Sequence, residues 1–137
     1  MTMNSLTRYA IPFYSIMRLI VGLMYFCHGA QKIFGWFAPP GQQAGALPPL
    51  MLAGGWVEIV CGVLIAVGLF TRVAAFIASG EMAVAFFMMH AKGSLLPIIN
   101  KGELAVVYCF LFFYIFLYGP GAWSLDVMLR KTTPTST

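Results

Sequence analysis

Apolar residues are gathered in four long runs along the chain, and short polar segments separate them. These runs lie at about 10–31, 50–70, 73–90 and 102–118. An apolar helix of about 20 residues crosses the roughly 30 Å of bilayer hydrocarbon, because each residue rises about 1.5 Å. Backbone amides in lipid must form hydrogen bonds within their own segment. The pattern therefore predicts an all-α membrane protein that is a bundle of four transmembrane helices.

The connecting segments differ in kind. The segment at 35–49 is rich in proline and glycine and predicts an irregular loop. Only Thr71 and Arg72 join the second and third runs, which predicts a tight antiparallel helical hairpin. After the fourth run, Ser124 is placed to cap a short amphipathic turn.

The composition agrees with a membrane protein and excludes several other classes. Of the 137 residues, 61% are hydrophobic and 9% are charged. Soluble domains carry about 25% charged residues, so this chain cannot cover a water-facing surface. A soluble enzyme, a nucleic-acid-binding protein and a disordered chain are all excluded. The expected surroundings are the lipid bilayer, with other membrane redox subunits or further copies of the chain as candidate partners.

The basic residues predict the orientation, because cytoplasmic flanks of transmembrane helices are enriched in Lys and Arg. Residues 1–131 are expected to form one transmembrane domain with the N-terminus in the cytoplasm, and 132–137 a disordered tail. Both termini are then cytoplasmic. In this orientation the inner cations are Arg8, Arg72, Arg130 and Lys131, and the outer ones are Lys32, Lys92 and Lys101.

Two charges lie deep within the first and third runs. Arg18 and Glu81 each lie eight residues from the expected cytoplasmic start of their runs. Because each helical residue rises about 1.5 Å, both charges lie at a depth of about 12 Å. Charges at such depth usually face the bundle interior and pair with one another. We therefore expect Arg18 and Glu81 to form one buried structural ion pair.

The other polar side chains of the runs fall in the outer half of the bilayer. Four helices contribute to this layer, and we expect its members to converge. On the first helix, Tyr25, Gly29 and Lys32 follow steps of three and four and so share one face with Arg18 and Gly22. The candidate ligand-binding residues of the layer are His28, Lys32, Glu58, Asn100 and Glu103.

Three interpretations of this layer remain open. The polar groups can form a hydrogen-bonded network that only fixes the register of the helices. They can line a small-ligand site, such as one for a quinone headgroup, since such sites combine an apolar pocket with a few polar groups. A haem site is the third interpretation, because His28 and His90 lie at matched depth on two helices that run the same way. No CxxC or HExxH motif accompanies these histidines.

Four short motifs in consistent order resemble the DoxX family of small bacterial membrane proteins. The resemblance covers about Arg18 to Asp126, and the ordered set is more specific than any one motif. The matching segments are HGAQKIFG from His28, Glu58 before Gly62 with GLFTR from Gly68, NKGE from Asn100, and GPGAWSLD from Gly119.

The resemblance implies a four-helix bundle in the bacterial plasma (inner) membrane and an association with quinone-linked oxidoreductases. The polar positions of the family then fall on Arg18, His28, Lys32, Glu58, Asn100 and Glu103. An accessory or quinone-interacting subunit of an electron-transfer system is therefore the leading functional hypothesis. The alternative is a non-catalytic structural or assembly subunit. The chain has no nucleotide-binding loop, so catalysis would need a partner that delivers electrons.

Overall fold

All the regular secondary structure is helical among the residues that the structure describes. In the computed structural model these are residues 3–41 and 46–132, and no strand occurs among them. The helices are α1 (Met3–Phe34), α2 (Pro49–Val67), α3 (Thr71–Ala85), the π-helical turn η1 (Phe86–His90), α4 (Pro97–Asn100), α5 (Glu103–Tyr118) and α6 (Leu125–Thr132).

Three of these elements are long and apolar enough to cross a membrane. They are α1 from Leu6 onward, α2, and α3 continued by η1. The apolar helix α5 is shorter, with 16 residues. Large apolar side chains cover the outer faces: Phe76, Val84 and Phe110 are 57%, 53% and 71% exposed. Acyl chains solvate such a surface and water does not. The expected all-helical membrane fold is confirmed at this level.

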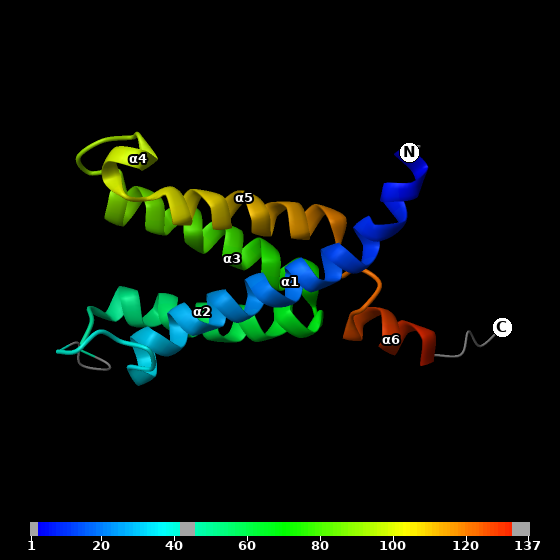
Figure 1. Ribbon diagram of the computed structural model, residues 1–137. Helices are drawn as coiled ribbons and strands as arrows, with labels where there is room; N and C mark the ends of the chain where they lie inside the picture. The colour runs from blue at the N-terminus through cyan, green and yellow to red at the C-terminus, as the bar shows by residue number, and fades with distance from the viewer. Residues whose placement is uncertain (1–2, 42–45, 133–137) are drawn as a thin grey trace.

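The helices pack as two pairs. α1 lies along α2, α3 lies along α5, and α2 and α3 form the main contact between the pairs. Tyr25, Tyr108 and Phe112 fill the interior and are at most 4% exposed. Figure 1 shows the pairs close together near the α2–α3 turn and farther apart toward α4. We call these two ends of the bundle the turn end and the loop end.

Glycines at matching positions let α1 and α2 approach closely. A Cβ atom at Gly22 would lie 2.8 Å from the carbonyl oxygen of Gly62, and one at Gly62 would lie 2.6 Å from the backbone nitrogen of Phe26. Gly29 and Gly55 face one another in the same way. Gly29 lies seven residues after Gly22 on α1, and Gly55 lies seven residues before Gly62 on α2. Small residues give membrane helices this close backbone contact. The pairing of α1 with α2 therefore sets the position of every polar side chain on the two helices.

At the turn end, α2 stops earlier than the apolar pattern predicts. The expected helix over 50–70 is wrong in its last residues, because Gly68 adopts a φ of 73° and α2 ends at Val67. The N–H groups of Gly68 and Leu69 both lie 2.9 Å from the Leu64 carbonyl oxygen, which closes the last turn. This is the usual glycine C-cap of a helix, which hydropathy alone does not detect.

The amphipathic helix α6 begins at its expected cap and in turn caps α3. The Val127 N–H donates to Ser124 Oγ at 3.3 Å. The Asp126 carboxylate accepts hydrogen bonds from the N–H groups of Phe70 and Thr71 at 2.9 and 3.0 Å, and from Thr71 Oγ1 at 2.9 Å. Partial burial raises the pKa of Asp126, but these hydrogen bonds lower it more, so its pKa lies below the ordinary value.

The other expected spans also differ from the observed helices in their bounds, and α1 extends beyond the run at 10–31 on both sides. The run at 73–90 corresponds to α3 and η1, so its last five residues form a π-helical turn. The run at 102–118 corresponds to α5, and α4 is a short helix in the segment that joins the third and fourth runs. The expected disordered tail begins at Thr132, but that residue ends α6. Residues 133–137 lie outside the described residues.

Candidate functional site

An ion pair joins α1 and α2 at the loop end. Lys32 Nζ lies 2.8 Å from Glu58 Oε1, and the two side chains are 25% and 3% exposed. The structure thus brings together two members of the expected polar layer. A carboxylate buried this deeply in an apolar bundle is costly without a partner. Lys32 supplies that partner from the last turn of α1.

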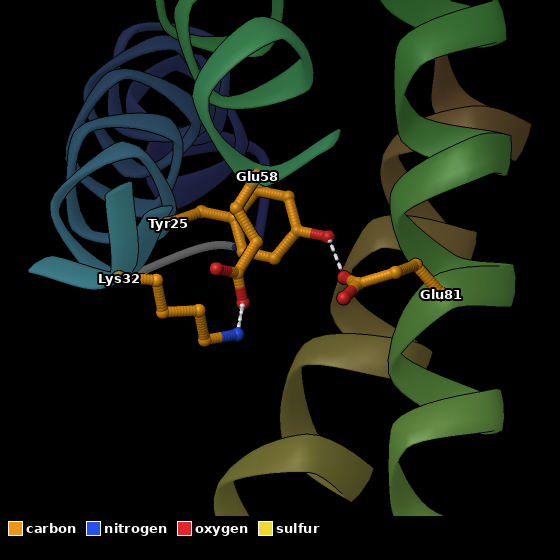
Figure 2. A network of polar contacts seen from close by, with 4 residues as sticks. All are labelled: Tyr25, Lys32, Glu58 and Glu81. Atoms are coloured by element: carbon orange, nitrogen blue, oxygen red, sulfur yellow. Dashed lines mark hydrogen bonds and ion pairs between the residues drawn. The ribbon is translucent and has the colours of Figure 1, made fainter. Parts of the chain in front are cut away.

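A second polar contact joins α1 to α3 at the same place. The Tyr25 hydroxyl donates a hydrogen bond to Glu81 Oε2. Figure 2 shows both contacts side by side, with the Tyr25 hydroxyl pointing at Glu81 and the Glu58 carboxylate pointing at Lys32. Glu58 has a cationic partner, whereas Glu81 has a neutral one. The two carboxylates therefore differ in the charge that faces them.

A cavity of about 270 Å³ lies between the two helix pairs at the loop end. Lys32 and the first turns of α2 line one side, and Glu81 and the residues up to Met89 line the other. We call it the Lys32 cavity. Its rim is apolar and exposed: Leu50 is 58% exposed, and Val84 and Met89 are each 53% exposed. Such residues face acyl chains in a bilayer, so the cavity opens sideways toward lipid.

Two further details concern the carboxylates of Glu81, which lines the Lys32 cavity, and of Glu58, which binds Lys32. A Cβ atom at Gly54 would lie 2.9 Å from Glu81 Oε1, so the glycine gives this carboxylate its space. Glu58 Oε2 is buried and has no hydrogen-bond partner among the described residues. Buried carboxylate oxygens nearly always have one. The cavity thus combines an apolar rim with one cation, Lys32, and one carboxylate, Glu81, whose hydrogen-bond partner is neutral.

The other expected members of the layer make different contacts. The Asn100 side chain donates to the Ser94 carbonyl at 2.9 Å and accepts from the Gly102 N–H at 2.7 Å, so it orders the segment before α5. Glu103 is exposed in the first turn of α5. Within the described chain, neither has a hydrogen bond to the Lys32–Glu58 pair. The ligand-binding role of Asn100 and Glu103 stays a prediction that these contacts do not support.

The two histidines have separate surroundings. The His28 ring is half-buried and meets the Tyr108 ring edge-on, with centroids 6.0 Å apart. His90 Nδ1 lies 3.1 Å from the Asn100 carbonyl oxygen, and its ring stacks on Phe86. Joint haem ligation by His28 and His90 stays a prediction. Among the described residues, no group of three or more His, Cys, Asp and Glu side chains is placed to hold a metal ion.

The expected ion pair between Arg18 and Glu81 is wrong. Arg18 Nη1 donates to the carbonyl oxygens of Ile65 and Ala66, the latter at 2.9 Å, and Nη2 donates to that of Trp123 at 2.6 Å. The first two carbonyls belong to the last turn of α2, which carries the negative end of the helix dipole. The Ile65 oxygen also accepts from the Gly68 N–H at 3.2 Å. Arg18 Nη1 and Nη2 thus bind backbone oxygens in place of a carboxylate, while the buried Arg18 Nε has no hydrogen-bond partner among the described residues.

The error has a geometric cause. Arg18 lies level with the α2–α3 turn, whereas the partner of Glu81 on α1 is Tyr25. Tyr25 is seven residues beyond Arg18, roughly 10 Å farther along the helix. Two residues at the same distance from the starts of their apolar runs therefore do not lie at the same level in the bundle. Tyr25 itself could have been found, because it lies on the polar stripe of α1 together with Lys32.

Taken together, the apolar helices and their inward polar side chains define a helical membrane protein with a lipid-facing cavity. The DoxX family model matches residues 13–91, which is more than half of the chain. The chain belongs to the DoxX family.

Two relatives match over most of their length. An uncharacterized protein of Haemophilus influenzae is 42% identical over 128 residues, which are 90% of this chain and 96% of the relative. An uncharacterized membrane protein of Mycobacterium tuberculosis is 34% identical over 131 residues, which are 83% of this chain and 79% of the relative. No solved structure matches the chain significantly.

Proposed function

We propose that this chain binds a quinone headgroup in the Lys32 cavity and serves as an accessory subunit of a bacterial membrane electron-transfer system. The observation that carries the proposal is the cavity itself: it opens toward acyl chains through an apolar rim and holds Lys32 and Glu81 on its wall. A ligand that enters from lipid and carries a polar head fits both features. Quinones are lipid-soluble molecules of this kind.

The residues present suit such a headgroup. At about 270 Å³, the Lys32 cavity is close to the lower limit of about 300 Å³ for small-molecule sites, so it takes a ring but not a long tail. Lys32 Nζ can donate a hydrogen bond to a carbonyl oxygen. Glu81, whose partner Tyr25 is neutral, can exchange a proton with the same ring. The quinone would supply the redox chemistry, and the chain would supply position and protons.

The topology that we propose has four spans with both termini in the cytoplasm of the bacterial inner membrane. In this arrangement α5 is the fourth span. Lys32 is engaged with Glu58 inside the bundle and does not act as a loop cation, which leaves only Lys92 and Lys101 on the outer side. The bias toward inner cations is therefore stronger than the sequence count indicates. Reporter fusions at both termini test this: activity of a periplasm-dependent reporter at either terminus contradicts it.

Titration with soluble quinone analogues tests the binding site. The purified protein in lipid nanodiscs is titrated with short-chain ubiquinone and menaquinone analogues, and binding is followed by calorimetry. We expect saturable binding that weakens about tenfold or more in Lys32→Gln and Glu81→Gln, because a hydrogen bond to a charged group contributes about 1.5–3 kcal/mol. Lys101→Gln and Glu103→Gln are matched controls at exposed positions and should bind as the wild type does. Absence of saturable binding, or equal affinity in all variants, contradicts the proposal.

A structural or assembly role is the second candidate, and one observation favours it. The contacts of Tyr25 with Glu81 and of Lys32 with Glu58 tie α1 to two other helices, so they can fix the bundle without any ligand. In that case Glu58→Gln lowers the thermal stability of the protein, whereas no quinone analogue binds to the wild type. Co-purification from native membranes with mass spectrometry then identifies the complex, its subunits and any bound lipid.

A further inference from the structure

The wall of the Lys32 cavity on the α3 side ends in the π-helical turn η1. In this turn the Ala91 N–H donates to the Phe86 carbonyl at 2.9 Å, which is five residues back along the chain. An α-helix would place this bond four residues back, so the turn is wound more widely. Met88 and Met89 of η1 are exposed and line the cavity. The π-helical winding therefore sets where these two side chains lie at the cavity rim.

The other face of η1 packs against the turn between α4 and α5. Phe86 is buried there, and a Cβ atom at Gly102 would lie 2.8 Å from two carbons of its ring. The His90 ring stacks on Phe86 with centroids 6.5 Å apart, and His90 Nδ1 donates to the Asn100 carbonyl at 3.1 Å. Figure 1 shows α4 and the start of α5 on one side of the end of α3, and α2 on the other. η1 is thus held from the side opposite the cavity.

The Asn100 side chain fixes the turn that η1 packs against. It donates to the Ser94 carbonyl at 2.9 Å and accepts from the Gly102 N–H at 2.7 Å. Between these residues Lys101 adopts a φ of 59°, a left-handed conformation that costs a non-glycine residue about 1–2 kcal/mol. Such a conformation persists only where the surrounding contacts impose it. The two hydrogen bonds of Asn100 are contacts of this kind.

We propose that the turn at 100–102 positions η1 and so sets the width of the Lys32 cavity, which makes Asn100 and Gly102 determinants of the ring size that enters. Neither is among the described residues that line the cavity. Both are positioning residues that act through His90 and Phe86. At about 270 Å³ the cavity is narrow for a small-molecule site, so a small displacement of one wall decides between a single and a fused ring. The choice of ring rests on the proposed function, whereas the coupling of the turn to the cavity wall does not.

Distances between two spin labels test the coupling without any ligand. The labels are attached to Leu50→Cys on α2 and Met89→Cys on η1, two exposed positions on opposite walls of the cavity. The three native cysteines are replaced by alanine in all variants. Double electron–electron resonance in lipid nanodiscs gives the distribution of distances between the labels.

Two variants act on the turn from different sides. Gly102→Leu should shorten the mean distance between the labels by about 2 Å or more, because a side chain there pushes Phe86 and η1 toward α2. Asn100→Ala should broaden the distribution, because the turn loses both hydrogen bonds of the side chain. The matched control for the glycine is Gly93→Leu, since a Cβ atom at Gly93 meets no other atom within 4 Å.

The matched control for Asn100→Ala is Ser94→Ala. It removes the hydrogen bond from the Leu96 N–H to Ser94 Oγ in the same segment, but it keeps the carbonyl that Asn100 binds. Distances in both controls should equal those of the parent protein. Asn100→Ala decides the coupling alone if Gly102→Leu does not fold.

The affinities of a benzoquinone and a naphthoquinone analogue test the choice of ring. Calorimetry measures both for the unlabelled variants in nanodiscs. Gly102→Leu should weaken naphthoquinone binding about tenfold more than benzoquinone binding, because the fused ring needs the space that η1 then occupies. A general loss of stability would leave this ratio of affinities unchanged.

Each outcome decides one part of the proposal. A shorter distance in Gly102→Leu and a broader distribution in Asn100→Ala, with unchanged controls, support the coupling. Unchanged distances in both variants overturn it, and so does the same change in variants and controls. Changed distances with an unchanged ratio of affinities overturn the role in ring size. If the wild type binds neither quinone, the proposed function fails, while the distances still decide the coupling.

Discussion

The two ends of the bundle use charged side chains in opposite ways. At the turn end, charges bind backbone groups: Arg18 closes α2, and Arg72 Nη1 donates to the carbonyls of Phe116 and Leu117 at 2.6 and 2.9 Å, which closes α5. At the loop end, charges bind other side chains, and a buried oxygen of Glu58 has no partner in the described chain. The contacts of the turn end close helix termini, whereas the loop end holds the polar groups of the proposed ligand site.

The largest effect is expected from the loss of the Arg18 side chain. Arg18 is 1% exposed and satisfies three carbonyl oxygens. Arg18→Met should lower the free energy of unfolding by roughly 3 kcal/mol or more, because the Ala66 and Trp123 carbonyls lose this donor and each buried carbonyl without a donor costs about 1–3 kcal/mol. Denaturation in mixed detergent micelles measures it. Arg8→Met, at an exposed position, should change stability little. Similar stability of both variants contradicts the structural role of Arg18.

A pair of glycine substitutions compares the two ends directly. A Cβ atom at Gly68 would lie 2.5 Å from Ser124 Cβ and 2.8 Å from Arg18 Nη1, and φ is 73°. Gly68→Ala should therefore cost about 2 kcal/mol or more. Gly54→Ala meets only the Glu81 carboxylate and should cost about 1 kcal/mol or less while displacing Glu81. Thermal denaturation measures both.

The control for this pair is Gly80→Ala, since a Cβ atom at Gly80 meets no other atom within 4 Å. Replacing an exposed helical glycine by alanine should raise stability by up to about 1 kcal/mol. If Gly54→Ala is as destabilising as Gly68→Ala, the loop end is packed as tightly as the turn end, and the contrast between them is lost.

A smaller effect at the turn end depends on pH. The pKa of Asp126 is lower in the folded protein than in the unfolded chain, so its contribution is fully present above about pH 3.9, the unfolded pKa. That contribution, about 1 kcal/mol, is lost as pH falls through the folded pKa. Asp126→Asn should be less stable at neutral pH, and the difference should vanish in acid. If the stability difference between the wild type and Asp126→Asn grows in acid, folding raises the pKa of Asp126, which contradicts this prediction.

The smallest effect on stability is expected at Glu81. Glu81→Gln keeps an acceptor for the Tyr25 hydroxyl and removes a charge that has no cationic partner among its hydrogen bonds. It should change the free energy of unfolding by less than about 1 kcal/mol, as is common for residues of functional sites. Chemical denaturation measures this beside Arg18→Met. A loss as large as that of Arg18→Met would make Glu81 a structural residue.

The sequence predicts the helices well because hydropathy and helix breakers are local signals. The four apolar runs and the Ser124 cap of α6 could all be found in this way. The end of α2 could not, because the apolar run continues past Gly68 and only the φ of that residue stops the helix. Hydropathy contains no information on backbone angles.

The site is predicted in part, since it depends on contacts between helices that are distant in sequence. The convergence of Lys32 and Glu58 could be expected, because both fall in the expected outer half of two consecutive antiparallel runs. The partner of Glu81 could not, because the register of α1 against α3 is set by glycine contacts and the α2–α3 turn. The spacing along α1 places Tyr25 on the polar stripe, but it does not indicate the partner of Tyr25 on another helix.

Photoaffinity labelling in native membranes tests the central claim most directly, namely that the Lys32 cavity receives a lipid-soluble headgroup from the bilayer. An azido-quinone probe is activated by light, and the labelled peptides are identified by mass spectrometry. We predict label on Met88 and Met89, which line the cavity. Excess unlabelled quinone should remove this label. Label confined to the turn end, or label at the cavity that excess quinone does not reduce, would contradict the account.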